Sequence, residues 1–324
     1  MNSAASSSIE ANMRIASIGE CMIELRQMPG GHLTRSFGGD TLNTAVYLAR
    51  LGAKVDYVTA LGDDPLSDEM IAGWQAEGIS TARVMRIKGR LPGLYMIETN
   101  EAGERRFYHW RDASAVRSLL SLPETDALLS ALADYDLIYL SAITLSLFDV
   151  AGRDRLIAAL QHARGAGVRV AFDTNFRARG WPDLDLARVA FQDAFVVSDI
   201  VLASVEDLLP LYPGEAEEKL LLRIDADEVV LKLDTPASII RHDGQSRRVE
   251  AEPVSGAVVD TTAAGDSFAA AYLHARLSGA QPVAAAKAGH YLAGTVVCHP
   301  GAIIPCEAMP DMIAFDTLMR GPSA

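Results

Sequence analysis

The chain has 324 residues, of which 49% are hydrophobic, and its formal net charge is −13. This length fits one large domain with a sizeable core, and the composition is that of a compact globular protein. The negative charge disfavours nucleic acid and anionic membranes as partners, and no apolar run reaches the ~18 residues of a membrane span.

Residues 1–12 are small and polar, with no basic start followed by an apolar stretch. They predict a disordered tail rather than a secretory signal, with Met13 as an alternative start. The three cysteines are too few and too scattered for a disulfide framework or a zinc site: Cys21, Cys298 and Cys306. A reducing cytoplasm is therefore the expected compartment.

From residue 14 onward, short apolar runs alternate with helical patterns. The runs that predict buried strands are 14–18, 54–60, 136–141, 168–172, 200–203 and 228–231. The patterns that predict helices are 41–51, 65–77, 153–165, 184–195 and 266–277. Such alternation predicts an α/β fold with a mostly parallel sheet. Ligands of these sheets bind beyond the carboxyl ends of the strands, which places Asp173 and Ser204 near a site.

Two segments, 22–37 and 91–112, break this alternation. Both are typical of β-hairpins, and the second turns at 100–103. They predict a small β-sheet lid, although an edge hairpin of the main sheet is the alternative. Lids exclude water and complete sites. The open edges of such a lid also predict a homo-oligomer, a dimer or higher.

The sequence has two loops of small residues that each precede a helical pattern, at 37–44 and at 260–268. The loop at 260–268 reads D-T-T-A-A-G-D-S-F. Ala263, Ala264 and Gly265 leave their backbone N–H groups open to a ligand. The first N–H groups of a helix have no intrahelical partner and attract anions. Asp266 is a candidate proton acceptor beside them, with a low pKa expected at a helix N-terminus. This arrangement suits phosphoryl transfer to a hydroxyl, and a plain N-cap is the alternative.

The first loop reads F-G-G-D-T-L-N-T over 37–44 and also opens a helix. Gly38 and Gly39 allow close approach of the backbone to a ligand. Asp40 and Asn43 lie one turn apart and offer acceptor and donor groups to hydroxyls. The alternative is that Asp40 only caps the helix.

Together the two loops resemble the G-G-x-x-x-N and D-T-x-G/A-A-G-D-x-F signatures of the ribokinase-like (PfkB) sugar kinases. The resemblance implies a three-layer sandwich with a lid, in a kinase domain at 13–310 that is followed by a tail at 311–324. It implies Asp266 as catalytic base and the N–H groups of 263–265 as stabilisers of the transferred phosphoryl group. It implies that the first loop holds the sugar through Gly38, Gly39, Asp40 and Asn43. ATP and Mg²⁺ are the implied cosubstrate and metal.

Other stretches resemble the 2-keto-3-deoxygluconate kinases, a branch of this family: 19–25, 91–95, 107–111, 173–177 and 301–305. The branch implies that four side chains hold the acid end of the substrate: Tyr95, Tyr108, Arg111 and Arg177. Arginine recognises carboxylates through two parallel hydrogen bonds. The alternatives are a solvated Arg111 on an edge strand and an ion pair between Asp173 and Arg177.

The nucleotide side departs from the family pattern. Four residues are implied near the nucleotide: Ser204, Lys232, Thr262 and Gly265. Where the family has N-x-x-E, this chain has Ser204 and Asp207. Either Asp207 or Glu206 is therefore the candidate for the residue that organises the metal. The glycine usual two residues after Lys232 is Asp234 here.

The resemblance therefore implies ATP-dependent phosphorylation of 2-keto-3-deoxy-D-gluconate to its 6-phosphate, in Entner–Doudoroff-type catabolism of sugar acids. A fructokinase or another neutral-sugar kinase with the same fold is the alternative enzyme. A sugar- or nucleotide-binding regulator without catalytic activity is the alternative of another class.

Overall fold

The computed structural model describes residues 13–99, 105–254, 256–311, 315, 317 and 318. The predicted tail at 1–12, most of the predicted tail at 311–324 and the predicted turn at 100–103 lie outside these residues. No helix in the described ranges is long and apolar enough to cross a membrane.

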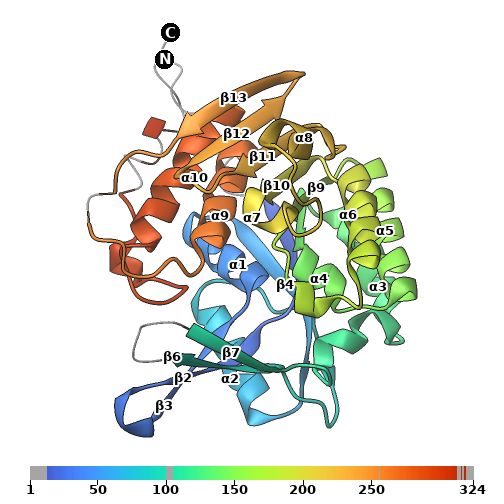
Figure 1. Ribbon diagram of the computed structural model, residues 1–324. Coiled ribbons are helices and arrows are strands. Elements are labelled where there is room, and N and C mark those ends of the chain that lie inside the picture. Colours follow the sequence, from blue (N-terminus) through green and yellow to red (C-terminus); the bar gives the residue numbers. More distant parts are fainter. Residues whose placement is uncertain (1–12, 100–104, 255, 312–314, 316, 319–324) are drawn as a thin grey trace, which may run out of the picture.

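A nine-stranded sheet in the order β13-β12-β11-β10-β9-β8-β1-β4-β5 forms the centre of the molecule (Figure 1). Its strands are β1 (Arg14–Ile18), β4 (Lys54–Gly62), β5 (Val84–Ile87), β8 (Leu137–Ser141), β9 (Arg169–Asp173), β10 (Ile200–Ser204), β11 (Glu228–Lys232), β12 (Ala237–His242) and β13 (Gln245–Glu250). All neighbours from β11 to β5 are parallel, and β12 and β13 add an antiparallel edge. The predicted mostly parallel sheet is confirmed.

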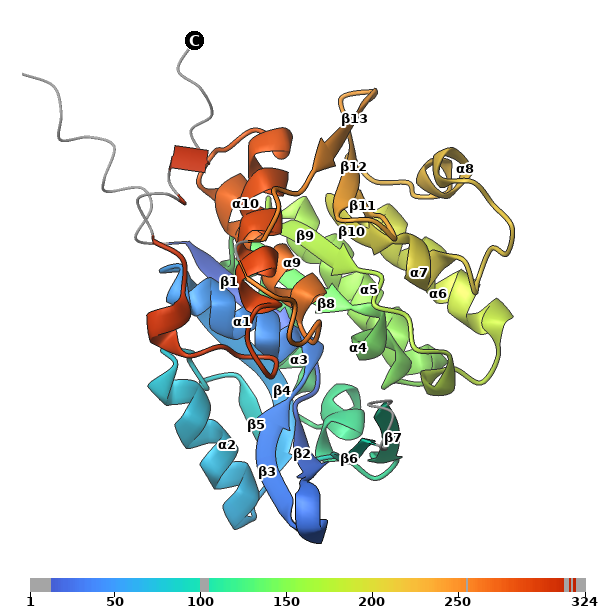
Figure 2. The same ribbon diagram turned by 60° about the vertical axis from the view of Figure 1, so that its left-hand side comes forward.

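Helices cover both faces of this sheet (Figures 1 and 2). They are α1 (Asp40–Arg50), α2 (Pro65–Ala76), α3 (Thr125–Ser130), α4 (Ala142–Ser146), α5 (Val150–Gly165), α6 (Leu184–Val197), α7 (Val205–Leu208), α8 (Glu217–Leu222), α9 (Ala264–Leu277) and α10 (Pro282–Val296). Side chains of α1, α2, α9 and α10 join one apolar cluster, and those of α3, α5 and α6 join the other. The result is the three-layer arrangement that the sequence predicts.

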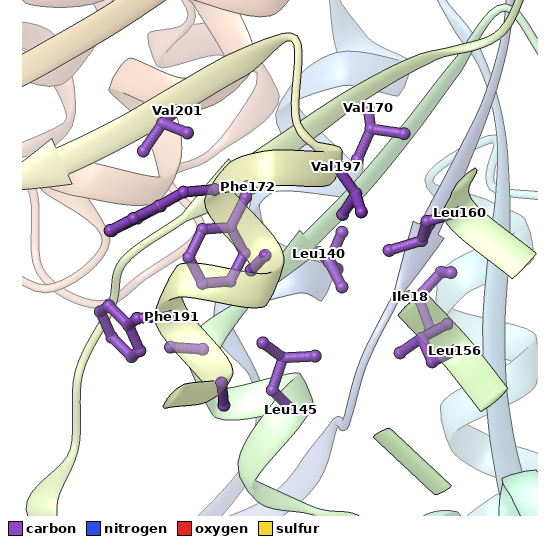
Figure 3. Packing of buried hydrophobic residues seen from close by; sticks show 14 of the residues in the cluster. Ile18, Leu140, Leu145, Leu156, Leu160, Val170, Phe172, Phe191, Val197 and Val201 are labelled. Atoms are coloured by element: carbon purple, nitrogen blue, oxygen red, sulfur yellow. The ribbon is translucent and has the colours of Figure 1, made fainter. Parts of the chain in front are cut away.

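Strand β8 shows why the central strands read as unbroken apolar runs. Leu137 and Tyr139 pack into the cluster under α1 and α9, whereas Ile138 and Leu140 pack into the cluster under α5 and α6. Side chains of a strand alternate between the two faces, so a strand covered on both faces is apolar at every position. Figure 3 shows part of the second cluster, where Leu140 lies among apolar side chains of neighbouring elements.

The periodicity of the sequence did not predict β5, β12, β13, α3, α4, α7, α8 or α10, and the reason is clear for β13 and α10. Strand β13 is exposed at nearly every position, so it lacks an apolar run. Helix α10 is rich in alanine and glycine and packs closely on α9. A Cβ on Gly289 would lie only 2.8 Å from the ring of Phe268, so part of its buried face has no large side chain to signal it.

The segments at 22–37 and 91–112 form a separate four-stranded sheet in the order β3-β2-β6-β7 (Figure 1). Its strands are β2 (Met22–Gln27), β3 (Leu33–Gly38), β6 (Leu94–Thr99) and β7 (Arg105–Trp110). Each segment is an antiparallel pair, and β2 and β6 join the two pairs in parallel. The predicted separate small sheet is confirmed, and the alternative of an edge hairpin on the main sheet is wrong.

Candidate active site

Helices α1 and α9 begin side by side, although their first residues are far apart in the sequence. The Asn43 amide donates a 2.8 Å hydrogen bond from Nδ2 to Oδ2 of Asp266, which lies 223 residues later. The hydroxyl of Thr44 donates to the backbone carbonyl of Asp266 at 3.3 Å. The structure thus brings the two glycine- or alanine-rich loops together into one site.

Hydrogen bonds to the Asp260 carboxylate fix the loop before α9. One carboxylate oxygen of Asp260 accepts bonds from the backbone N–H and the hydroxyl of Thr262, at 3.0 and 2.6 Å. The other accepts from the backbone N–H of Gly301 at 3.1 Å. Ala263 then caps α9 with φ of 60°, in the left-handed region that favours glycine. Gly265 and Asp266 follow in the first turn of α9, where the first backbone N–H groups have no partner within the helix.

Asp266 differs from expectation in its acidity. Burial and the nearby charge of Asp40 raise the pKa of Asp266 to about 8, although the bond from Asn43 lowers it. The prediction of a low pKa at the helix N-terminus is therefore wrong. The reason is that the dipole acts over one turn of helix, whereas loss of water and a second carboxylate act directly on the charged form. A raised pKa makes this carboxylate a stronger proton acceptor.

A buried ion pair lies between the ends of β9 and β11. Lys232 Nζ donates to Asp173 Oδ2 at 3.1 Å, and a Cβ on Gly265 would lie 3.5 Å from the same ammonium. Burial lowers the pKa of Lys232, but the carboxylates of Asp173 and Asp207 outweigh it and leave the pKa raised. Lys232 is therefore a fixed positive charge beside the anion loop.

The first loop depends on its glycines for space. A Cβ on Gly39 would collide with the backbone carbonyl of Glu20, and one on Gly38 would collide with the hydroxyl of Tyr95. Asp40, at the start of α1, accepts hydrogen bonds from Ser141 and Asn175. Tyr95 in turn donates to Glu24, and burial raises the pKa of Tyr95.

The register of the small sheet decides which aromatic side chains accompany Tyr95. Tyr95 is paired with His109 across β6 and β7, and their rings stack with centroids 5.9 Å apart. Since neighbouring residues of a strand face opposite sides, Tyr108 lies on the other face, where it donates to Glu98. The structure therefore does not bring Tyr108 to Tyr95. His109 is the residue of β7 that lies beside Tyr95. The sequence indicated this, because His109 and Arg111 are two residues apart and so share a side of an extended chain.

Both arginines implied for the acid end are paired with carboxylates of the chain. Arg111 forms an ion pair with Glu20, and their side chains are 16% and 2% exposed. Burial raises the pKa of Glu20 despite this guanidinium. Arg177 Nη1 lies 3.4 Å from Asp207 Oδ1 and donates to the carbonyl of Phe176 at 2.7 Å, and its side chain is 60% exposed. The alternative of an ion pair between Asp173 and Arg177 is wrong, because Asp173 pairs with Lys232 and Arg177 pairs with Asp207.

The two candidates for organising the metal differ sharply. Both oxygens of Asp207 accept hydrogen bonds, Oδ2 from Ser204 and Thr174 and Oδ1 from the backbone N–H of Phe176. Glu206 is exposed. Among the described residues, no group of three or more His, Cys, Asp or Glu side chains could hold a metal ion.

An anion loop with a carboxylate and a fixed ammonium, facing a second loop with hydroxyl-binding groups, is the site of a kinase for small hydroxyl compounds. The chain belongs to the pfkB family of carbohydrate kinases, whose sequence profile matches residues 12–309.

Individual relatives and solved structures agree with this family. The chain is 45% identical to the 2-dehydro-3-deoxygluconokinase of Dickeya dadantii over 306 residues, 91% of this chain and 98% of that protein. Its fold is similar to that of the 2-dehydro-3-deoxygluconokinase of Thermotoga maritima, with a TM-score of 0.80 and 22% identity over 96% of this chain and 99% of that one. Its fold is also similar to that of a fructokinase from Xylella fastidiosa with bound ATP. The TM-score is 0.79 and the identity 22%, over 95% of this chain and 98% of the fructokinase. At these identities the two structures speak for the fold alone.

The left-handed conformation of Ala263 predicts a stability difference between two adjacent substitutions. Ala263→Gly should raise the free energy of unfolding by about 0.5–1 kcal/mol, because the left-handed region costs an L-residue more than glycine loses in chain entropy. Ala264→Gly, at the first residue of α9, should lower it by up to about 0.5 kcal/mol, because glycine loses more chain entropy on folding than alanine. Urea unfolding of both variants measures the difference. Equal losses in the two variants would contradict the conformation assigned to Ala263.

Proposed function

We propose that the protein transfers the γ-phosphoryl group of ATP to the 6-hydroxyl of 2-keto-3-deoxy-D-gluconate, also called 2-dehydro-3-deoxygluconate. The contact between Asn43 and Asp266 carries the kinase part of this proposal. It joins the loop at 37–44, which would bind the sugar, to the loop at 260–268, which would supply the base and bind the phosphoryl group. The sugar-acid part rests on the 45% identity to the Dickeya relative and on the cationic side chains Arg111 and Arg177. The product would enter Entner–Doudoroff-type catabolism.

In this proposal Asp266 takes the proton of the substrate hydroxyl as that oxygen attacks the γ-phosphorus of ATP. The backbone N–H groups of 263–265 and the ammonium of Lys232 stabilise the charge that develops on the transferred group. Gly38, Gly39, Asp40 and Asn43 hold the hydroxyls of the sugar. Thr262 and Ser204 border the nucleotide.

The acid end of the sugar is proposed to lie against Tyr95, Arg111 and Arg177. We place His109 beside them in the position first predicted for Tyr108, because it shares a face with Tyr95. Mg²⁺ bound with the phosphates of ATP would neutralise their charge. Asp207 would act on that ion through water, since its oxygens already bind protein groups.

The alternative enzyme is a fructokinase. The Xylella fructokinase shares the fold at 22% identity, and a neutral sugar gives no role to the two arginines. The alternative of another class is a regulator that binds sugar or nucleotide without turnover. A base with a raised pKa beside an anion loop favours catalysis over that alternative.

Substrate preference should separate these alternatives. With ATP and Mg²⁺, kcat/KM for 2-keto-3-deoxygluconate should exceed that for gluconate, fructose and ribose by at least about tenfold, or ~1.4 kcal/mol in transition-state binding. Arg111→Ala should remove most of this advantage and leave turnover of neutral sugars unchanged. Arg106→Ala is the matched control, since Arg106 is exposed on β7, the strand that leads to Arg111, and its side chain faces the other side of the small sheet.

Loss of Arg111 leaves Glu20 buried without its partner, so the double variant Glu20→Gln/Arg111→Ala separates misfolding from lost recognition. Preferred turnover of fructose by the wild type would favour the fructokinase. Absence of turnover with every sugar would favour the regulator.

The acidity of Asp266 should set the pH dependence. The base must be ionised, so kcat/KM should rise about tenfold per pH unit below the pKa of about 8 and level off above it. Asp266→Asn should lower kcat by about 10²–10⁴-fold with a modest change in KM for the sugar, and should abolish this ionisation. Steady-state kinetics between pH 6 and 10 test both. A variant with wild-type turnover, or with the same ionisation, would remove Asp266 as the base.

We further propose a homo-oligomer formed through the small sheet. Its outer strands β3 and β7 carry exposed Leu33 and Trp110, which are 52% and 59% exposed. Unpaired strand edges and exposed apolar side chains favour pairing with a second copy. Light scattering should give at least twice the chain mass of 34.7 kDa, and Trp110→Glu should lower it. A monomer mass at working concentration contradicts the proposal.

The proposed compartment is the cytoplasm. Cys21, Cys298 and Cys306 are all free of disulfides, and Cys306 is exposed, which fits a reducing environment. Cell fractionation that recovers the protein outside the cytoplasm would contradict this.

A further inference from the structure

The carboxylate of Asp40 is held by side chains from two other elements. Ser141, at the end of β8, donates from Oγ to Asp40 Oδ2 at 2.5 Å. Asn175, in the loop after β9, donates from Nδ2 to the same oxygen at 2.9 Å. We call these three residues the Asp40 clamp. None of the sequence motifs assigned a role to Ser141 or Asn175.

Each donor of the clamp is itself fixed. The hydroxyl of Ser141 accepts the backbone N–H of Thr144 at 3.4 Å as the N-cap of α4. A hydroxyl has a single proton, and this arrangement leaves that proton for Asp40. The clamp is therefore built on the start of a helix and not on a mobile side chain.

The second donor is anchored through the buried ion pair described above. The backbone N–H of Asn175 donates to Asp173 Oδ1 at 3.0 Å, while Asp173 Oδ2 accepts from Lys232. Ser141 and Asp173 are directly paired neighbours in the ladder of β8 and β9. Hydrogen bonds thus run without interruption from the ammonium beside the anion loop to Asp40.

The clamp occupies only one oxygen of Asp40. Oδ1 of Asp40 has no hydrogen-bond partner among the described residues, and neither has Oδ1 of Asn43, which is 5% exposed. Oδ1 of Asn43 is buried without a partner, a cost that a ligand hydroxyl would offset, whereas Asp40 is half-buried. Asp40 and Asn43 lie one turn apart on α1, so the two free acceptors lie on one helix face beside Asp266.

We infer that Ser141 and Asn175 are positioning residues of the sugar site, which hold Oδ2 of Asp40 so that Oδ1 accepts a hydroxyl of the substrate next to Asp266. This inference rests on the proposed function, because a sugar is the ligand. It also accounts for the acidity of the base, since the clamp keeps the charge of Asp40 close to Asp266, where that charge raises the pKa.

The test compares Ser141→Ala and Asn175→Ala with the wild type and with Ser146→Ala. Ser146 is the matched control, because its hydroxyl donates only to the carbonyl of Ile143 within the α4 region. Each clamp variant should raise KM for the sugar acid about tenfold, on the scale of a hydrogen bond to a charged group. At a pH well above 8, where Asp266 is ionised in every variant, kcat and the KM for ATP should change little. The control should leave all three constants unchanged.

The second readout needs no substrate. Carbon-13 NMR of the Asp266 carboxyl, identified by its absence in Asp266→Asn, gives the pKa of Asp266 in the free protein. Without the clamp the Asp40 charge moves away or is neutralised, so this pKa should fall below the wild-type value of about 8. A purely structural role for Ser141 and Asn175 would lower the melting temperature and leave this pKa in place.

The outcomes distinguish the inference from the proposed function. If the wild type turns over the sugar acid and both clamp variants keep its KM and its Asp266 pKa, the inference is overturned and the function stands. If the wild type turns over no sugar, the function fails, and an unchanged Asp266 pKa in the variants overturns the clamp as well. Should Ser141→Ala unfold through loss of the α4 cap, Asn175→Ala, at a half-buried loop position, still decides.

Discussion

The site depends on one hydrogen bond, from the Asn43 amide to the Asp266 carboxylate. It joins the first turns of α1 and α9, which carry the two loops that no local part of the sequence could bring together. Both helices start at the carboxyl edge of a parallel sheet, where their unpaired N–H groups and dipoles face the same space. The loops at 37–44 and 260–268 meet in one site because the sheet aligns these helix starts.

That space is unusually rich in carboxylates, and their mutual effects set its chemistry. Asp40, Asp173 and Asp266 all lie at or near the strand ends, and Lys232 supplies a nearby positive charge. Burial and repulsion raise the pKa of Asp266, which would suit the base role proposed for it. The arginines Arg111 and Arg177 are already paired with Glu20 and Asp207, so an acid substrate would have to compete with these carboxylates for them.

The small sheet contributes side chains in a pattern set by its register. Tyr95 and His109 are stacked on the face that continues into Gly38, whereas Tyr108 faces the other side. The two faces alternate along each strand, so a one-residue difference decides which aromatic ring lies beside Tyr95. His109 in place of a tyrosine gives this face a titratable ring, and burial together with Arg111 lowers its pKa.

The sequence by itself determined the alternating strands and helices, the two loops at 37–44 and 260–268, the separate small sheet and the family. These depend on local periodicity and on short motifs, which are visible without distant contacts. Only the tertiary structure decided the raised pKa of Asp266, the place of His109, the partner of Arg111 and the clamp on Asp40. Each of these arises between segments far apart in the chain, where burial and neighbouring charge outweigh what a residue's own helix or strand favours.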